Sequence, residues 1–467
     1  MMRWYCFSLC LTLFVSVGHA RQDKSDLQAV AAISQITEGR VTATISFLAS
    51  DELAGRATAS PEFDIAAAYV ASRFRGAGLV GGADGSFYHE TSMRMVQIPS
   101  APFTITNADN GSIQHFGLLA CSSDPFKYSG ELFTLDLSAD LPTAGLSGVV
   151  GGVYQGDAKG PRLLSQVLRI AGKLSEAGAK MLLLGVAPDS ELIQLAQQSR
   201  DKPRPESPQN RFAIPVLLVP ESSLDSKSLR LEVPATLVLD KPMRNVIGML
   251  AGTDPELSKE AILFSAHLDH LGVRTGVGDV IYNGADDDAS GVTAVVTLAD
   301  AFGAMPRPKR TLLFMAFWGE ESGLLGSKQF VANPSWPLEK IVANINIEMI
   351  GRPEPGANGK IWMTGWQESN LGPLMNSASI LRGTEIFEHP SFSSRLYRAS
   401  DNWSFAEKGV IAHSFSAGSL HADYHQPDDE WERLEIPHMT RVIQGLFYAS
   451  QPLVQGTATP ISSKKER

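Results

Sequence analysis

Cysteine is scarce in this 467-residue chain. Only three cysteines occur, and two of them, Cys6 and Cys10, stand within the first 20 residues. That leading stretch has a basic residue, an apolar run and a small-residue ending at Ala20, which is typical of a cleaved secretory signal. After its removal only Cys121 is left, so an intrachain disulfide is excluded. We expect this lone thiol to behave as a small buried side chain.

Long apolar runs are also missing. The N-terminal run is shorter than the roughly 20 residues that cross a bilayer, and no later run is long enough to replace it. We therefore expect a secreted or periplasmic protein that has no membrane partner once the signal peptide, residues 1–20, is removed. A membrane anchor formed by these same residues is the alternative.

A basic surface is absent as well. The 40 Lys and Arg residues are outnumbered by 50 Asp and Glu residues, which gives a formal net charge of -10. Nucleic-acid modules need a basic surface to contact phosphates, so this class of protein is excluded. Hydrophobic residues make up 43% of the chain. This is enough to bury a core, and it excludes a mainly disordered protein.

The pattern of apolar segments divides the mature chain into parts. Residues 21–124 contain a segment, Ser60 to Leu79, with a serine N-cap, a proline at the first helical position and glycines at its end, which predicts a helix. Residues 125–240 combine short apolar strands with one amphipathic helix, and they predict a small inserted domain rich in β-strands. Residues 241–455 predict a larger domain, and the polar residues 456–467 predict a disordered tail.

Apolar runs alternate with helical patterns from residue 244 onward. AILFSAH, TLLFMAFW and IVANINI are typical of buried strands, and the Ala- and Val-rich segment Ala289–Phe302 predicts a helix. This alternation predicts an α/β fold, a mostly parallel mixed sheet covered by helices on both faces. Open sheets of this kind bind their ligands at the carboxyl ends of the strands.

Ionisable side chains follow these predicted strands. In chain order they are His267, Asp269, Asp286 to Asp288, Glu320, Glu321, Glu348 and His425. Taken singly, each could be a solvated loop residue, a helix cap or a surface acid. Brought to one edge of a sheet, so many carboxylates would repel one another, and a cation is the natural way to neutralise them. Their ordered occurrence at successive strand ends therefore predicts a metal centre.

Five motifs carry a family resemblance: HLDHLG, GADDDASG, EESGLLGS, NIEMIGR and DYHQPDDE. Together they resemble the successive motifs of the M28 family of co-catalytic zinc aminopeptidases. The stretch LASDELAGRATASPEFDIAAAYVASRFRGAGL resembles the N-terminal segment of exported bacterial members, and residues 125–240 resemble a protease-associated domain. The resemblance implies the zinc-peptidase fold and an exported enzyme that removes the N-terminal residue from peptide substrates.

The resemblance also implies two zinc ions per chain. The implied ligands are Asp287 as the bridge, His267 and Glu348 for one ion, and Glu321 and His425 for the other. Asp287 is chosen because it stands three residues before Ser290, where the family's bridging aspartate lies, and the family precedent is a cis peptide bond after it. Three protein ligands per ion leave a position for solvent.

The resemblance implies a role for Glu320 and Tyr397, and the spacing on the strand indicates one for Asp269. A hydroxide between the ions would attack the peptide carbonyl, and Glu320, which matches the family's general base, would take the proton from water. Asp269, two residues after His267 on a strand, would accept the other ring N–H of this histidine and fix its tautomer. Tyr397 stands where some members place a tyrosine that donates to the developing oxyanion, with a packing role as the alternative.

Two positions depart from the family pattern. Glu348 stands where many members have Asp, and Asn402 replaces a histidine that often follows the Ser-Asp pair. His270 and His421 also lie near the motifs. We expect these two histidines to be neighbours of the ligands or surface residues, and not ligands.

Other functions stay open at this point. Carboxypeptidase or dipeptidase action on the same scaffold would differ in how the substrate's end is recognised. Glutaminyl cyclisation takes place on a related fold with one zinc, and the five implied ligands argue against it because they suffice for two ions. A metal-free, receptor-like binding protein would be marked by the loss of ligands. Serine hydrolysis and the HExxH type of zinc site are disfavoured, because neither GxSxG nor HExxH occurs. The sequence does not determine the oligomeric state.

Overall fold

The structure of this chain is a computed structural model. It describes residues 32–98, 103–107, 111–120, 124–156, 160–199, 204–205, 214–274 and 277–463. The predicted signal peptide, Cys121 and the last four residues lie outside these ranges. None of the helices in the described ranges has the length and apolar character that a membrane span requires.

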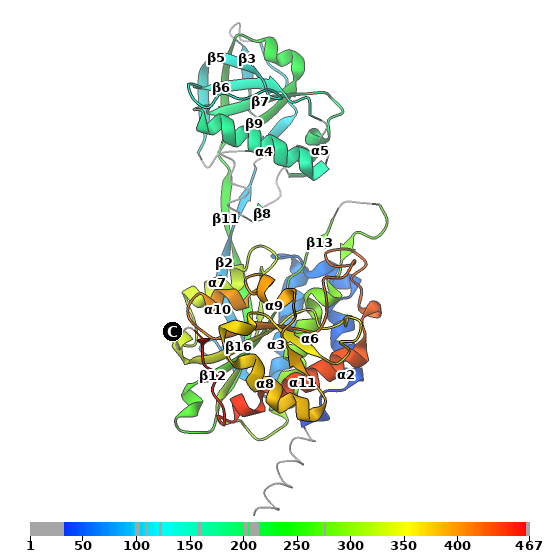
Figure 1. The fold of residues 1–467 in the computed structure, drawn as a ribbon. Coiled ribbons are helices and arrows are strands. Elements are labelled where there is room, and N and C mark those ends of the chain that lie inside the picture. The colour runs from blue at the N-terminus through cyan, green and yellow to red at the C-terminus, as the bar shows by residue number, and fades with distance from the viewer. Residues whose placement is uncertain are drawn as a thin grey trace, which may run out of the picture. The chain divides into compact units, whose positions relative to one another are not determined.

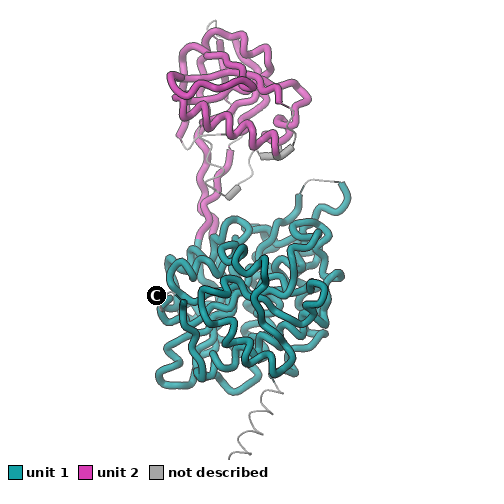
Figure 2. Tube along the Cα trace, viewed as in Figure 1, with its two compact units in different colours: residues 1–91, 243–467 teal, residues 92–242 magenta. Residues whose placement is uncertain are grey.

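The chain folds into two compact units, which Figure 2 distinguishes by colour. Unit 1 comprises Met1–Thr91 and Met243–Arg467, and unit 2 comprises Ser92–Pro242. The chain enters unit 2 along β2 (Tyr88–Gln97) and returns along β11 (Leu237–Leu250). The second unit contains the stretch in which we expect an inserted domain, and it begins before residue 125.

A mixed β-sheet forms the centre of unit 1. The sheet order is β18-β17-β19-β16-β12-β15-β11-β2-β8, and β1 pairs with β11. The remaining strands of this sheet are β1 (Val80–Gly81), β12 (Ala261–His267), β15 (Thr311–Phe317), β16 (Ile341–Ile347), β17 (Ile361–Met363), β18 (Ile386–Phe387) and β19 (Ala412–Ser416). The last strand in the order, β8 (Arg204–Pro205), belongs to unit 2 and pairs there with Met95 and Val96 of β2. The neighbours β19, β16, β12 and β15 are parallel, whereas β11 is antiparallel to β15. This confirms the predicted α/β fold, with the parallel strands at the centre of the sheet.

Helices cover both faces of this sheet (Figure 1). They are α2 (Glu38–Leu48), α3 (Pro61–Gly76), α6 (Gly291–Gly303), α7 (Leu325–Ala332), α8 (Leu371–Ser379), α9 (Phe392–Arg395), α10 (Asn402–Ala406) and α11 (Ile436–Val454). Successive side chains of a strand point to opposite faces. Phe264 and Phe314 contact Phe302 of α6, whereas Phe317 contacts Phe405 of α10. Because both faces are covered, the central strands are continuous apolar runs.

Local signals set the helix ends as the sequence predicts. The hydroxyl of Ser60 accepts the N–H of Phe63 at 3.0 Å, and Pro61 is the first residue of α3. In α6, the predicted apolar face, which includes Val292, Val295 and Ala299, is fully buried. A short two-stranded sheet and several 3-10 or irregular turns complete unit 1: β13 (Gly272–Val273), β14 (Ile281–Tyr282), η1 (Asp51–Arg56), η4 (Leu257–Lys259), η5 (Ala285–Ser290), η6 (Leu338–Lys340), η7 (Trp366–Glu368), η8 (Ile380–Arg382) and η9 (Trp431–Arg433).

Unit 2 contains a seven-stranded sheet in the order β3-β10-β5-β6-β7-β9-β4. Its elements are β3 (Ile105–Asn107), β4 (Gly117–Ala120), β5 (Phe126–Asp136), β6 (Val149–Val153), α4 (Gly160–Glu176), β7 (Met181–Val186), α5 (Glu191–Ser199), β9 (Val216–Pro220), η3 (Glu221–Asp225) and β10 (Ser228–Val233). Val167, Ala171 and Leu174 on the predicted face of α4 are buried in its core. Strands β3 and β4 precede residue 125 and pair with β10 and β9, which explains why the unit begins earlier than composition suggests.

The described part of the C-terminal tail, residues 456–463, is held by unit 1. The buried side chain of Arg310 donates to the carbonyl oxygen of Ala458 at 2.9 Å and to the hydroxyl of Thr459 at 2.7 Å. The N–H of Ile461 donates to Asn370 Oδ1 at 2.7 Å. These contacts correct the expectation of a disordered tail for this stretch, because a buried guanidinium supplies partners that local composition does not reveal.

Candidate metal centre

Three neighbouring strands deliver the candidate residues to one edge of the sheet. Strand β12 lies between β16 and β15 and is parallel to both, so their carboxyl ends meet. His267 is the last residue of β12, Glu348 directly follows β16, and Glu320 lies three residues after β15. His425 comes from the loop that follows β19.

Asp287 lies at the centre of the cluster. Its Oδ1 is 3.1 Å from His267 Nε2, and its Oδ2 is 3.0 Å from His425 Nε2. The two oxygens of one carboxylate therefore face two histidines from different parts of the chain. Asp287 is 3% exposed, and the peptide bond between it and Asp288 is cis, as the family resemblance implies.

Glu348 lies on the His267 side of Asp287. Its Oε2 is 3.8 Å from His267 Nε2, while its Oε1 accepts hydrogen bonds from Asn346 Nδ2 at 3.0 Å and from the hydroxyl of Ser400. These two donors fix the carboxylate so that one oxygen faces the histidine. Burial raises the pKa of Glu348, although the neighbouring His267 opposes this shift.

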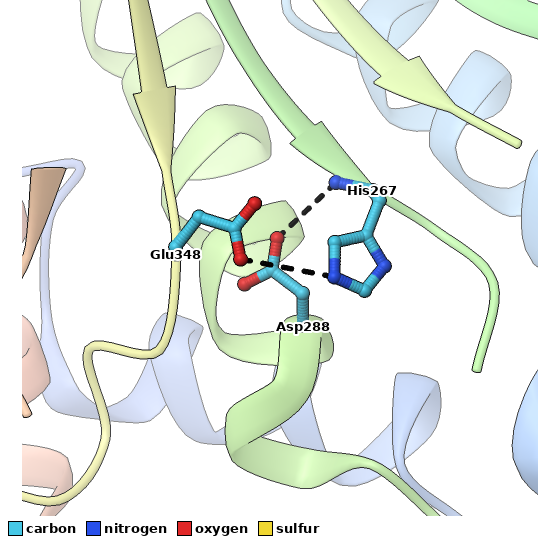
Figure 3. A group of neighbouring side chains, drawn as sticks. All are labelled: His267, Asp288 and Glu348. Carbon is cyan, nitrogen blue, oxygen red and sulfur yellow. Dashed lines mark hydrogen bonds and ion pairs between the residues drawn. The ribbon is translucent and has the colours of Figure 1, made fainter. Parts of the chain in front are cut away.

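Asp288 occupies the space between His267 and Glu348 in Figure 3. Its Oδ2 accepts the main-chain N–H of His267 at 3.1 Å, and its Oδ1 accepts the N–H groups of Gly291 at 3.1 Å and Met349 at 3.2 Å. These bonds tie the end of β12, the start of α6 and the segment after β16 to one another. The side chain of Asp288 thus holds the segments that carry the candidate ligands.

Glu321, His425 and His270 gather on the other side of Asp287. Glu321 Oε1 is 3.3 Å from His425 Nε2 and 2.8 Å from His270 Nδ1. We expected His270 to lie outside the ligand set, yet the structure brings it into this group. His421, the other additional histidine, lies apart from the group and contacts Asp286 at 3.2 Å.

Several polar atoms of this second group have close neighbours but make no hydrogen bond to a described residue. In the part of the chain that the structure describes, Glu321 Oε1 and both ring nitrogens of His270 are buried without a hydrogen bond of acceptable geometry. Buried polar atoms normally have a partner. Imidazole nitrogens and carboxylate oxygens that converge in this way are the donor set that zinc prefers, so the residues present fit a metal ion.

The electrostatics of the cluster also favour a cation. Burial alone would raise the pKa of Asp287, but hydrogen bonds from His267 and His425 hold it well below its usual value. Burial opposes protonation of His425, yet Asp287 and Glu321 raise the pKa of this histidine to about 9. These two carboxylates therefore favour a proton on the imidazole of His425. A divalent cation would supply the same positive charge at the point where these groups meet.

Glu320 lies beside the cluster and lines the same pocket as His267 and Asp287. Burial raises the pKa of Glu320 well above its usual value, and the carboxylates of Glu348 and Asp401 add to this effect, although His267 opposes it. A carboxylate with a raised pKa is better suited to take up a proton near neutral pH than an ordinary glutamate.

Asp269 contacts its neighbours differently from the expectation. His267 Nδ1 lies 3.0 Å from the main-chain carbonyl oxygen of Asp269, which accepts its hydrogen bond, whereas the nearest carboxylate oxygen is 4.0 Å away. The Asp269 side chain instead accepts the hydroxyl of Thr58 at 2.6 Å and the N–H of Glu320 at 3.1 Å. The backbone therefore orients the histidine, and the carboxylate positions the segment that carries Glu320.

A pocket opens beside His267 and Glu348. Its apolar lining includes Met349, Trp362, Phe392, Leu396 and Leu420. Tyr424 also lines this pocket, and its ring stacks on His425 with centroids 3.9 Å apart. Burial and the nearby carboxylates of Asp287 and Glu321 raise the pKa of the Tyr424 phenol, which keeps its hydroxyl proton available for donation.

Tyr397, the tyrosine singled out from the sequence, is not among the described residues that line this pocket. Its ring stacks on His413 at 5.5 Å, contacts Trp403 edge-on and lies against Gly365. Tyr424 stands directly before His425 in the motif DYHQPDDE, and this adjacency is the signal that could have identified it.

Arg56 is a further residue that sequence reasoning missed. Its fully buried guanidinium donates to the carbonyl oxygens of Leu48, Leu268, Asn283 and Gly284. The carbonyls of Leu268, Asn283 and Gly284 belong to the segments that follow His267 and precede η5, whereas Leu48 is the last residue of α2. Burial lowers the pKa of Arg56 to about 10, although Asp269 opposes the shift, so the group stays charged at neutral pH. The signal for it is the motif LAGR within the resembling N-terminal stretch.

Fold and site together define a class, the α/β proteins in which histidines and carboxylates form two adjoining groups at the edge of a parallel sheet. Within this class the family can be named. Residues 245–449 match the model of peptidase family M28.

The chain is also similar to named relatives. The chain is 25% identical over 269 residues to aminopeptidase YwaD of Bacillus subtilis (strain 168), a match that covers 55% of each protein. It is 44% identical over 120 residues to a probable zinc metalloprotease of Pyrenophora teres f. teres (strain 0-1), which covers 26% of this chain and 23% of that protein. The chain thus spans about half or less of the length of these curated relatives.

Solved structures share the fold. The zinc aminopeptidase BSAP from Bacillus subtilis superimposes with a TM-score of 0.54 at 18% identity, covering 91% of this chain and 97% of that one. The aminopeptidase from Aneurinibacillus sp. strain AM-1 gives a TM-score of 0.52 at 18% identity, with coverage of 91% and 95%.

Replacement of Arg56 by Met tests its role in the site. The Arg56→Met variant keeps the length of the side chain but leaves buried carbonyl oxygens without donors, and each such group costs about 1–3 kcal/mol. We expect the free energy of unfolding of unit 1 to fall by roughly 3 kcal/mol or more, measured as a shift of its thermal unfolding midpoint. Arg40→Met is the matched control, because the Arg40 side chain is 49% exposed. Equal melting of the two variants would contradict the role.

Proposed function

We propose that this chain is an exported aminopeptidase that works with two zinc ions. The observation that carries the proposal is the carboxylate of Asp287, whose two oxygens face His267 and His425. Glu348 and Glu321 lie beside these histidines, one on each side. The match of residues 245–449 to peptidase family M28 supports peptide hydrolysis, and likeness to aminopeptidase YwaD supports removal of N-terminal residues.

The donor set suits zinc in number and kind. We assign Asp287 to both ions, with His267 and Glu348 completing one site and Glu321 and His425 the other. Glu348 keeps the role of a ligand despite its extra methylene, because Asn346 and Ser400 hold one of its oxygens and turn the other towards His267. When bound, the ions supply positive charge that polarises a substrate carbonyl and lowers the pKa of water.

Glu320 acts as the general base in this proposal. Its carboxylate lines the pocket next to His267 and Asp287, and its raised pKa lets it hold a proton between two steps of the reaction. It takes a proton from water and passes it to the departing amine. Asp269 supports this by accepting the N–H of Glu320 and so fixing where the side chain begins.

Tyr424 is the candidate for stabilising the carbonyl oxygen as negative charge develops on it. Its phenol lines the pocket, and the stacking contact with His425 fixes the plane of its ring. A donor held in place before the reaction contributes more than one that must reorganise. We assign Tyr397 a packing role, because its ring contacts His413 and Trp403.

The lining of the pocket favours an aminopeptidase over a carboxypeptidase. Recognition of a C-terminal carboxylate calls for a cationic group, and the described residues that line the pocket include neither Lys nor Arg. Glu320 and Glu348 in the same lining would attract a protonated N-terminal amine. The apolar wall formed by Met349, Trp362 and Phe392 would accept an apolar side chain of the first residue.

The N-terminal residues and the inserted unit also enter the proposal. Export rests on the signal-like character of residues 1–20. The identity of the insert as a protease-associated domain rests on its sequence resemblance and on its β-rich fold with two helices.

Substrates with free and blocked amines test the proposed activity. Leucine p-nitroanilide should be hydrolysed, and its N-acetylated form should be at least about 100-fold poorer, because the blocked amine carries no charge for the carboxylates to attract. Removal of metal with 1,10-phenanthroline should abolish the activity, and added zinc should restore it. An undiminished rate in the demetallated protein would overturn the proposal, and preference for a blocked N-terminus with a free C-terminus would favour the carboxypeptidase.

Replacement of Glu320 by Gln tests the general base. The variant should lose kcat by about 100-fold to 10,000-fold, because the amide cannot accept the proton from water. It should bind as much zinc as the unaltered chain, since Glu320 is not assigned to either ion. Activity assays and elemental analysis of the same samples provide the measurement. A parallel loss of zinc and of activity would place Glu320 among the ligands instead.

The two tyrosines provide a matched pair of variants. Tyr424→Phe should reduce kcat by about 100-fold or more with little effect on KM, because the missing hydroxyl acts as charge develops on the substrate. Tyr397→Phe should change kcat less than about threefold, because its ring packs away from the pocket. The reverse ranking in steady-state kinetics would show that the sequence-based assignment of Tyr397 is the right one.

A further inference from the structure

The group of side chains on the far side of Asp287 contains one histidine more than the proposed ligand set uses. Building on the proposed two-zinc function, we propose that His270 is a fourth protein ligand for the ion held by Asp287, Glu321 and His425. This ion would then be enclosed by protein ligands, whereas the ion at His267 would keep an open position. The two sites would differ in affinity and in function.

The positions of four atoms carry the proposal. They are His270 Nδ1, Asp287 Oδ2, Glu321 Oε1 and His425 Nε2. His270 Nδ1 lies 2.8 Å from the Glu321 oxygen and 3.8 Å from the Asp287 oxygen, and His425 Nε2 lies 3.3 Å and 3.0 Å from these same oxygens. Ligand atoms about 2.0–2.2 Å from a tetrahedral zinc are about 3.3–3.6 Å apart. The observed separations lie on both sides of this range.

The described residues around His270 provide no hydrogen-bond partner for its ring nitrogens. The side chain is fully buried, and in the described part of the chain neither ring nitrogen makes a hydrogen bond of acceptable geometry. Buried polar atoms normally have partners. A metal ion at the meeting point of these four atoms would satisfy the nitrogen that faces Glu321.

The backbone around His270 holds the ring in this place. The N–H of His270 donates to the carbonyl oxygen of Arg56 at 3.2 Å. Its ring lies against Gly284, where an added Cβ would come within 2.4 Å of ring atoms. Gly284 has φ +57°, so two requirements, the left-handed backbone and the close approach of the ring, both favour glycine here.

The pocket distinguishes the two sites independently. Its lining includes His267, Asp287 and Glu348, the ligands of the first site, but not His270, Glu321 or His425. Zinc sites closed by four protein ligands are typically structural, whereas sites with three keep a position for solvent or substrate. The three-ligand site is thus the one that faces the pocket, and the site with His270 is the one turned away from it.

Zinc titration of the metal-free chain, read with a competing chromophoric chelator, tests this difference. The unaltered chain should bind two equivalents, one of them much more tightly than the other. His270→Ala should weaken the tight equivalent at least 100-fold and leave the weaker one within about threefold. His421→Gln is the matched control, because His421 contacts Asp286 and not this group, and it should retain both equivalents.

A second variant separates ligation from hydrogen bonding. His270→Gln can still donate a hydrogen bond to Glu321, but it lacks the imidazole nitrogen. We expect it to behave as His270→Ala does. Recovery of the tight equivalent in His270→Gln would overturn the proposal, because His270 would then act only by orienting Glu321.

X-ray absorption of the unaltered chain loaded with one equivalent of zinc needs no variant. The proposal predicts two imidazoles per zinc, from His270 and His425, and a single imidazole would overturn it even if the variants fail to fold. If the proposed two-zinc function is wrong, the zinc titration would give a different result. The unaltered chain would then bind fewer than two equivalents, whatever the surroundings of the bound ion.

Discussion

The carboxylate of Asp287 contacts a different histidine with each of its two oxygens, and the rest of the site depends on this arrangement. His267 and His425 approach it from opposite sides, and each brings a second carboxylate with it. Such a concentration of buried acids is tolerable only with compensating positive charge. Protonation of His267 and His425 supplies such charge, since the pKa of each is raised, and two cations would supply it in the proposed zinc enzyme.

The surrounding structure fixes the position of this carboxylate. Asp429 accepts the main-chain N–H groups of Asp286 and Asp287, and Asp288 accepts N–H groups from three separate segments. Arg56 donates to the carbonyls on either side. These interactions hold the turn before α6 from several directions. Behind it, the sheet is packed on both faces, so its strand ends provide a rigid edge.

Local sequence patterns predicted the parallel strands, the start of α3 and the meeting of several site residues. Continuous apolar runs indicated the parallel strands, and Ser60 and Pro61 indicated the start of α3, because both signals depend on nearby residues. The order of His267, Glu320 and Glu348 at successive strand ends, with Asp287 at the start of the helix between them, indicated that they would meet, since parallel strands place their carboxyl ends at one edge. The structure brings these residues together as that argument expects.

The parts that the sequence did not predict depend on contacts between distant segments. Nothing local shows that Arg56 would reach the segments around residues 268 and 284, or that His270 would turn towards Glu321. Tyr424, which lines the pocket in place of Tyr397, is the exception, because it stands directly before His425 in the sequence. Nothing local shows that Arg310 would hold the tail either. Strands β3 and β4 joined unit 2 for the same reason, because their partners come about 100 residues later in the chain.

Anomalous diffraction at the zinc edge, from crystals grown with zinc, tests the sharing of Asp287 most directly. The account predicts two peaks about 3.5–4 Å apart, one beside each oxygen of the Asp287 carboxylate. A single peak, or two peaks of which neither lies against Asp287, would contradict it.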